Sequence, residues 1–327
     1  MAERLLLHIG YHKTATSWMQ QHLFVPEHGY VQIAHHPEVW RHVVAPHGLL
    51  FDPAGMQEVI RDGMAAVPEG KVPVISSEIL SGHPFFGGMA SDDYARRLKA
   101  IAPDARILIS VRSQQSILTS VYMQYLLRGG TMSPQLFFAG DPELGFHGFR
   151  PEHFEYHRLI GLYQQLFGAE NVHMITQESL VSDMDGAARR LARFAGNAEF
   201  DSVLPTRRAG YAPSYPEYAV PILRRINKFQ KSVLTPAPII GIGETPKGLY
   251  RIFGYILRRP PFAWLMKDLR PVSRHVEQTF KGRFDASNRK LAEIAGCYTS
   301  FNHNATNGAP ENEHLGRRIG RRVQLFD

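Results

Sequence analysis

The 327-residue sequence predicts an α/β protein with a central parallel sheet flanked by helices and a helical carboxy-terminal elaboration. Four apolar runs, bounded by turn residues and separated by helical patterns, predict the strands: residues 5–9, 72–76, 107–111 and 172–176. These runs do not alternate with polar residues, which is typical of strands that are buried on both faces of a parallel sheet. With 44% hydrophobic residues, the chain can bury such a core in one large domain.

Helical periodicity is clearest after the third run. In residues 113–127 the apolar side chains recur along one face, and Ser120 lies off that face. Residues 152–167 and 186–195 are predicted as further helices. Past Pro205, repeated prolines interrupt shorter helical segments, so the fold of this region should differ from that of the sheet.

The first run leads directly into a turn that has the features of an anion-binding loop. Gly10 permits a sharp exit from the strand, and the first amides of the next helix are free to point at a phosphate. Lys13 adds a positive charge, and Thr14, Thr16 and Ser17 add hydroxyl donors. An ordinary strand-to-helix turn with a solvated lysine is the alternative interpretation.

Chemically distinctive residues also follow the next two runs. Glu78 comes after the second run and Arg112 ends the third. Because ligands of open parallel sheets bind at the carboxyl ends of the strands, we expect Lys13, Glu78 and Arg112 to share one cleft.

A nucleoside-triphosphate loop of the G-x-x-x-x-G-K-[ST] type would place glycines six and one residues before its lysine. Leu7 and His12 occupy those positions. A P-loop-type kinase would also need Mg²⁺, with Thr14 and Glu78 as the available ligands. The loop therefore favours a less charged anionic group that is transferred without a metal, and the kinase remains an alternative.

Residues 8–18, His-Ile-Gly-Tyr-His-Lys-Thr-Ala-Thr-Ser-Trp, resemble the 5'-phosphosulfate loop of sulfotransferases. Residues 106–120 resemble that family's 3'-phosphate element, in which an arginine at a strand end precedes by eight residues a serine on the next helix, here Arg112 and Ser120. The similarity extends to 156–180 and 284–296 but not to 235–280. It implies the P-loop-like fold of the bacterial-type sulfotransferases that depend on 3'-phosphoadenosine 5'-phosphosulfate (PAPS).

The resemblance also implies roles for individual residues. Lys13 would stabilise the leaving 5'-phosphate, Glu78 would be the general base, and His12 would be a donor beside the sulfuryl group. His12 and His83 remain alternatives for the base, since imidazole titrates near neutral pH. Trp18 would pack in the core or on the adenine. The residues expected to bind the donor are Lys13, Thr14, Ala15, Thr16, Ser17, Trp18, Arg112 and Ser120.

On this interpretation the chain is one sulfotransferase domain with three parts. Residues 1–204 would form the nucleotide-binding α/β core, 205–285 a variable helical lid or acceptor region, and 286–327 a closing helix and basic tail. The acceptor would carry a hydroxyl or an amine; carbohydrate is slightly favoured by Glu78, while lipid, phenol and peptide acceptors stay open.

Charge is distributed unevenly along the chain. Residues 1–204 hold 16 Lys and Arg against 21 Asp and Glu, a balance of −5, whereas residues 205–327 hold 21 against 9, a balance of +12. A basic third suits a polyanionic ligand, an acidic acceptor, a membrane surface or nucleic acid, or is simply a solvated face. A binding module for anionic surfaces or nucleic acid is thus a non-enzymatic alternative, but no nucleic-acid-binding motif is evident and we expect no nucleic-acid partner.

Residues 250–267 mix bulky apolar and basic side chains, which suggests a lipid-linked acceptor or contact with an anionic membrane, or a packed helix. A single cysteine, Cys297, excludes an internal disulfide and any multi-cysteine zinc site. No signal peptide is expected, because residues 5–10 run directly into the anion loop. We expect a cytoplasmic protein, in solution or peripheral at the inner face of the membrane.

Overall fold

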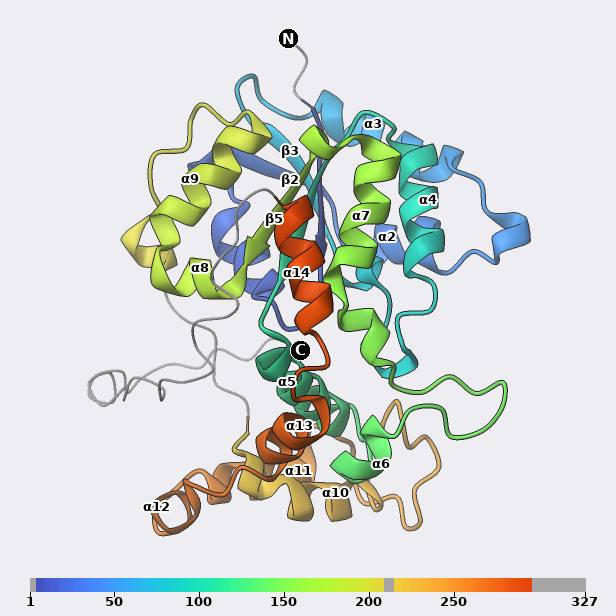
Figure 1. Cartoon of the computed structure of the whole chain (residues 1–327), viewed down its shortest axis with the longest axis vertical. Coiled ribbons are helices and arrows are strands. Elements are labelled where there is room, and N and C mark those ends of the chain that lie inside the picture. The colour runs from blue at the N-terminus through green and yellow to red at the C-terminus, as the bar shows by residue number, and fades with distance from the viewer. Residues whose placement is uncertain (1–3, 209–214, 296–327) are drawn as a thin grey trace.

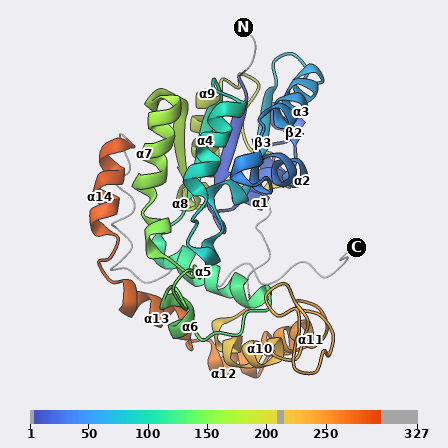
Figure 2. The same cartoon turned by 90° about the vertical axis from the view of Figure 1, so that its right-hand side faces the viewer.

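The computed structural model describes residues 4–208 and 215–295, and it confirms the parallel α/β sheet. The five strands, all parallel, lie in the order β2-β3-β1-β4-β5, with helices on both faces of the sheet (Figures 1 and 2). Their bounds are β1 Leu6–Gly10, β2 Tyr30–Ala34, β3 Val72–Ser76, β4 Arg106–Val111 and β5 Val172–Thr176.

The α-helices cover the sheet and form the lower end of the molecule in Figure 1. Their bounds are α1 Thr16–Trp18, α2 His36–Val39, α3 Ala54–Ala65, α4 Ser91–Ile101, α5 Gln114–Leu127, α6 Pro134–Phe138, α7 Tyr156–Phe167, α8 Gln177–Ser182, α9 Met184–Ala195, α10 Val220–Asn227, α11 Gly248–Leu257, α12 Phe262–Met266, α13 Pro271–Phe280 and α14 Asp285–Ile294.

Alternate residues of the central strands face two separate cores. Leu7 and Ile9 of β1 belong to the core that includes side chains of α4, α5 and α7. Leu6 of β1 and Leu108 of β4 face the other core, which includes side chains of α9. Burial on both faces explains why the sequence of these strands is continuously apolar.

The four predicted strands are present to within one residue, but the edge strand β2 was not predicted. Its sequence, Tyr-Val-Gln-Ile-Ala, contains a polar residue at its centre. Gln32 donates its side-chain amide to the carbonyls of Gln20 (2.8 Å) and Phe24 (3.1 Å), so it ties the strand to the segment after α1. An edge strand with one neighbour tolerates such a residue, and its hydrophobic signal is correspondingly weak.

Beyond β4, the helix α5 extends away from the sheet and packs against α10 and α13. These helices, with α11 and α12, form the end of the molecule opposite the N-terminus (Figure 1). None of the helices in the described ranges is both long and apolar enough to span a membrane. Cys297 and most of the predicted basic tail lie outside the described residues.

Candidate active site

The loop after β1 has an unusual backbone. Lys13 and Ala15 adopt φ angles of 70° and 67°, in the left-handed region that residues with a side chain seldom occupy. This conformation costs about 1–2 kcal/mol per residue, so surrounding interactions must hold it. The N–H of Tyr11 donates to the carbonyl of Ser110 (3.0 Å), and the hydroxyl of Thr14 donates to the carbonyl of Tyr11 (2.6 Å).

A buried hydrogen-bond network lies beneath this loop. His8, at the centre of β1, contacts the Ser76 hydroxyl through Nδ1 (2.8 Å) and the Ser110 hydroxyl through Nε2 (3.0 Å). The Ser110 hydroxyl in turn contacts the hydroxyl of Thr14 at 2.7 Å. Burial lowers the pKa of His8 to about 3, so the imidazole is neutral at physiological pH. The network therefore fixes the loop to β3, β1 and β4 without a buried charge.

A cavity of about 540 Å³ opens at the carboxyl ends of the strands, beside the loop. Four basic side chains and one carboxylate line it: Lys13, Arg112, Arg128, Arg208 and Glu78. Positive charge gathered around one cavity at the strand ends is suited to binding an anion.

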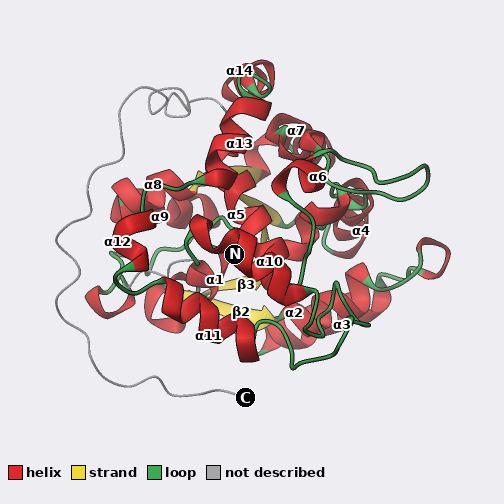
Figure 3. Ribbon diagram, turned by 90° about the horizontal axis from the view of Figure 1, so that it is seen from below, coloured by secondary structure: helices red, strands yellow, loops and turns green. Residues whose placement is uncertain are grey.

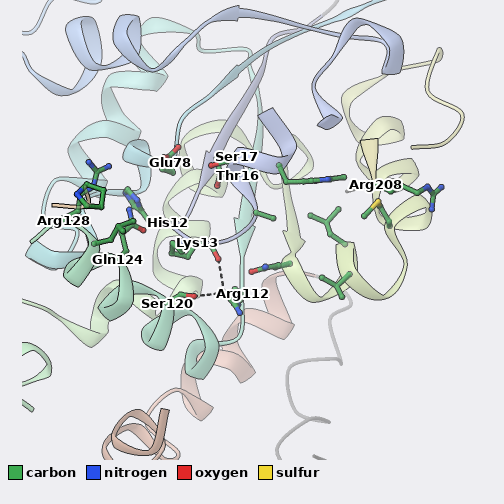
Figure 4. Close-up of a pocket in the computed structure, with 18 of the residues that line it drawn as sticks. His12, Lys13, Thr16, Ser17, Glu78, Arg112, Ser120, Gln124, Arg128 and Arg208 are labelled. Carbon is green, nitrogen blue, oxygen red and sulfur yellow. Dashed lines mark hydrogen bonds between the residues drawn. The ribbon is translucent and has the colours of Figure 1, made fainter. Parts of the chain in front are cut away.

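The centre of the cavity unites the two elements that the sequence analysis singled out. One Nη of Arg112 donates to the Ser120 hydroxyl (3.0 Å) and approaches the Lys13 carbonyl oxygen (3.5 Å), as Figure 4 shows. The Tyr156 hydroxyl donates to the Arg112 carbonyl (2.7 Å) and so fixes the end of β4. Glu78 also lines the cavity, so the expected cleft shared with Lys13 and Arg112 is present.

Burial and the neighbouring Arg112 lower the pKa of Lys13, while Glu78 opposes that shift. Burial also lowers the pKa of Arg112, and Glu178 opposes it. Within the described ranges, Lys13 forms no salt bridge with a carboxylate. Two cations that are costly to desolvate and close to each other would be stabilised by a bound anion.

The cavity has two different ends. His12, Gln124 and Arg128 lie on one side of Lys13, and Arg208 lies on the other (Figure 4). Arg208 is held by Asp185 through a 2.5 Å ion pair. Three apolar residues of α8 and α9 also line the cavity, namely Leu180, Val181 and Met184. The cavity can therefore take a ligand with an anionic centre and an apolar or planar part.

Two histidines lie close together near the loop. The rings of His12 and His83 are 5.7 Å apart between centroids. Burial, and then the nearby His83, lower the pKa of His12 to about 3; burial and Arg128 lower that of His83 to about 4. The buried Nε2 of His12 has no hydrogen-bond partner within the described part of the chain. His12 is thus a neutral imidazole with one uncommitted nitrogen in the cavity wall.

The remaining predicted loop residues are placed in two ways. The cavity is lined by Ala15, Thr16, Ser17 and Trp18. The indole N–H of Trp18 also donates to the Arg207 carbonyl (3.1 Å), and the Trp18 ring packs in the core that includes side chains of α9. The Thr14 hydroxyl instead belongs to the buried network, so this side chain acts on the loop.

Gln124 and Arg128 are polar residues of the cavity that were not predicted from the sequence. They follow Ser120 at intervals of four residues, which places Ser120 and Gln124 on one face of α5 and puts Arg128, the C-cap residue, just beyond the end of that helix. That spacing was the signal that could have revealed them. Val233, Thr245 and Pro246 were also missed, because the segment that carries them has no readable pattern.

In residues 4–208 and 215–295, no group of three or more His, Cys, Asp or Glu side chains is arranged to hold a metal ion. No protein-family model matches the chain, and no curated protein matches it.

Two solved structures are similar to parts of the chain. A sulfotransferase from Alicyclobacillus acidocaldarius shares 21% identity and a TM-score of 0.46 over 69% of this chain and 93% of its own. The mouse sulfotransferase SULT7A1 complexed with PAP shares 14% identity and a TM-score of 0.40 over 89% of each chain. At these identities and TM-scores the similarity carries no information on the roles of individual residues.

Proposed function

We propose that this protein is a sulfotransferase that moves the sulfuryl group of PAPS to a hydroxyl or amine acceptor, without a metal. The observation that carries the proposal is the meeting of the Lys13 loop with Arg112 and Ser120 in one cavity. PAPS has phosphate at both ends of its ribose, so it needs two anion sites at a fixed separation.

The residues of the cavity fit the two ends of this donor. The loop amides from Thr14 to Ser17 and the hydroxyls of Thr16 and Ser17 would hold the 5'-phosphosulfate. Arg112 would bind the 3'-phosphate together with Ser120, a pairing that their 3.0 Å hydrogen bond already prepares. Trp18 and the apolar residues of α8 would face the nucleoside.

The transfer needs charge stabilisation at one point and proton removal at another. As the bond between sulfur and the bridging oxygen breaks, negative charge grows on that oxygen, and the Lys13 ammonium would stabilise it. The acceptor oxygen or nitrogen forms the new bond to sulfur and gives its proton to Glu78. His12 would donate a hydrogen bond to the sulfuryl oxygens through its uncommitted nitrogen.

Glu78 is preferred over the histidines as the base for a physical reason. Burial lowers the pKa of His12 to about 3 and that of His83 to about 4, so neither imidazole keeps the near-neutral pKa that favours histidine as a base. The carboxylate of Glu78 lines the cavity beside Lys13, whereas His83 is not among the described residues that line it.

A metal-independent transfer is supported by the orientation of Thr14. In a magnesium-dependent phosphoryl-transfer loop, the hydroxyl after the lysine binds the cation. Here that hydroxyl donates to the Tyr11 carbonyl and contacts Ser110 within the buried network.

The test is isothermal calorimetry with 3'-phosphoadenosine 5'-phosphate (PAP) and with ADP, each with and without Mg²⁺, on the wild type and on Arg112→Ala. We expect PAP to bind at least about tenfold more tightly than ADP without Mg²⁺, and this preference to vanish in the variant. A preference for ADP with Mg²⁺ would refute the proposal in favour of a kinase. Affinity for neither nucleotide, with strong salt-dependent binding to DNA or RNA, would favour the binding module.

A further inference from the structure

The helix α11 exposes apolar side chains on the face that points away from the protein. On its inner face Tyr250, Gly254 and Leu257 are buried. Tyr250 and Leu257 belong to a small hydrophobic core that α11 shares with α10. On the other face, Ile252 is 53% exposed and Ile256 is 43% exposed. A surface helix of a water-facing domain normally presents polar residues there.

The helix α12, which contacts α11, extends this surface. In α12, Trp264 is 73% exposed and Leu265 is 68% exposed. We call these residues, with Ile252 and Ile256, the apolar tip. Figure 3 looks onto the end of the molecule that carries α10, α11 and α12. Apolar side chains gathered in this number mark an interaction surface.

Basic residues accompany the apolar tip. Residues 247–270 contain six Lys and Arg and one acidic residue, Asp268, a balance of +5. Arg251, Arg259 and Lys267 are exposed, and the guanidinium of Arg259 lies 4.4 Å from the ring centre of the exposed Tyr255. The partner must therefore accept apolar side chains and neutralise positive charge at the same time.

An anionic bilayer meets both requirements. Trp and Tyr rings prefer the headgroup level, and long basic side chains reach the lipid phosphates while their stems stay apolar. Lys is depleted at protein–protein interfaces, whereas Lys247 and Lys267 both accompany the apolar tip. The helices α11, with ten residues, and α12, with five, are too short to span a bilayer and suit the plane of its surface.

We infer that the apolar tip docks this protein onto an anionic membrane surface, with Trp264, Leu265, Ile252 and Ile256 inserted below the lipid headgroups. This inference does not depend on sulfuryl transfer. It does bear on access to the cavity, because Val233, Thr245 and Pro246 of the cavity wall lie in the segment that joins α10 to α11. Docking would place this wall of the cavity close to amphiphilic acceptors held in the membrane.

The experiment is flotation of the full chain with vesicles of phosphatidylcholine alone and of phosphatidylcholine mixed with phosphatidylglycerol. We expect the protein to float with the anionic vesicles, less so at high salt, and to stay in solution with the neutral ones. The double variant Trp264→Ser, Leu265→Ser should bind the anionic vesicles at least about tenfold more weakly. Arg251→Glu should weaken binding in the same direction through charge alone.

The matched control is Leu49→Ser, Leu50→Ser, which removes two leucines that are 89% and 78% exposed far from this end. Its flotation should equal that of the wild type. The far-UV circular dichroism spectrum and the melting temperature should be unchanged in all variants, which shows that they are folded.

Two results would overturn the inference. One is a wild-type protein that does not float with anionic vesicles. The other is a Trp264→Ser, Leu265→Ser variant that floats as well as the wild type. If the wild type fails to float but dimerises in analytical ultracentrifugation, and the double variant is monomeric, the apolar tip is a self-association surface instead.

Discussion

Replacing Gly10 with alanine should disrupt the anion loop without touching a ligand. The added Cβ would lie 2.5 Å from the Thr16 hydroxyl and 2.8 Å from the Ser110 hydroxyl, well inside the 3.4 Å at which ordinary contact begins. The Ser110 hydroxyl cannot move away freely, because it contacts both Thr14 and His8, and the Thr16 hydroxyl lies 3.4 Å from that of Thr14.

The size of the effect follows from these contacts. Overpacking by a methyl group costs about 1–3 kcal/mol, and a buried hydrogen bond broken by the shift costs about 1–3 kcal/mol more. Alanine also lowers the conformational entropy of the unfolded chain, which stabilises the folded state by about 0.4–1 kcal/mol. We therefore expect Gly10→Ala to lower the free energy of unfolding by about 1–6 kcal/mol, and the displaced loop to weaken PAP binding by at least about tenfold.

Urea unfolding and calorimetry with PAP measure the two effects. Gly161→Ala is the matched control, because no atom lies within 4 Å of its added Cβ and it sits inside α7. That substitution should raise the free energy of unfolding by about 1 kcal/mol and leave PAP affinity unchanged. If Gly10→Ala behaves like Gly161→Ala in both assays, the argument for a tightly held loop is refuted.

Three further predictions concern the chemistry and the acid sensitivity of the protein. Glu78→Gln should lower kcat by about 100-fold or more with an unchanged PAP affinity in calorimetry, and an equal loss of PAP affinity would contradict a role as base. Ser120→Ala should weaken PAP binding by about tenfold and leave ADP binding unaltered; an equal loss for both nucleotides would argue against a 3'-phosphate contact. Burial lowers the pKa of His8, His12 and His153 from 6.5 to about 3, so the unfolded chain takes up protons below about pH 6.5 that the folded chain does not. Each of the three then removes about 1.4 kcal/mol of stability per pH unit as the pH falls toward 3, and a melting temperature that stays constant from pH 8 to pH 5 would show that these groups do not titrate this way.

Local patterns in the sequence were sufficient to predict much of the fold. The strands β1, β3, β4 and β5 are continuous apolar runs, and the anion loop follows the first of them within a few residues. The edge strand β2 was not predicted because Gln32 interrupts its apolar pattern. The Gln32 side chain bonds to the carbonyls of Gln20 and Phe24 in the segment after α1.

The network beneath the loop could not be predicted, because it depends on the register of three strands. His8 meets Ser76 and Ser110, which are 68 and 102 residues away in the sequence. A histidine in an apolar strand gives no sign of such partners. The cavity wall formed by Thr245 and Pro246 also depends on tertiary structure. The packing of α10 against α11 brings the segment between these helices to the cavity.

The network also explains how this loop forms without the glycines of a nucleoside-triphosphate loop. Lys13 and Ala15 take the left-handed backbone conformation that glycine adopts at little cost, and together they store about 2–4 kcal/mol of strain. Three buried hydrogen bonds of His8, Ser110 and Thr14 hold the loop. Each contributes about 0.5–1.5 kcal/mol, and together they offset a strain of this size. Because His8 must be neutral to accept and donate within this network, the geometry of the anion site depends on a histidine that never touches the anion.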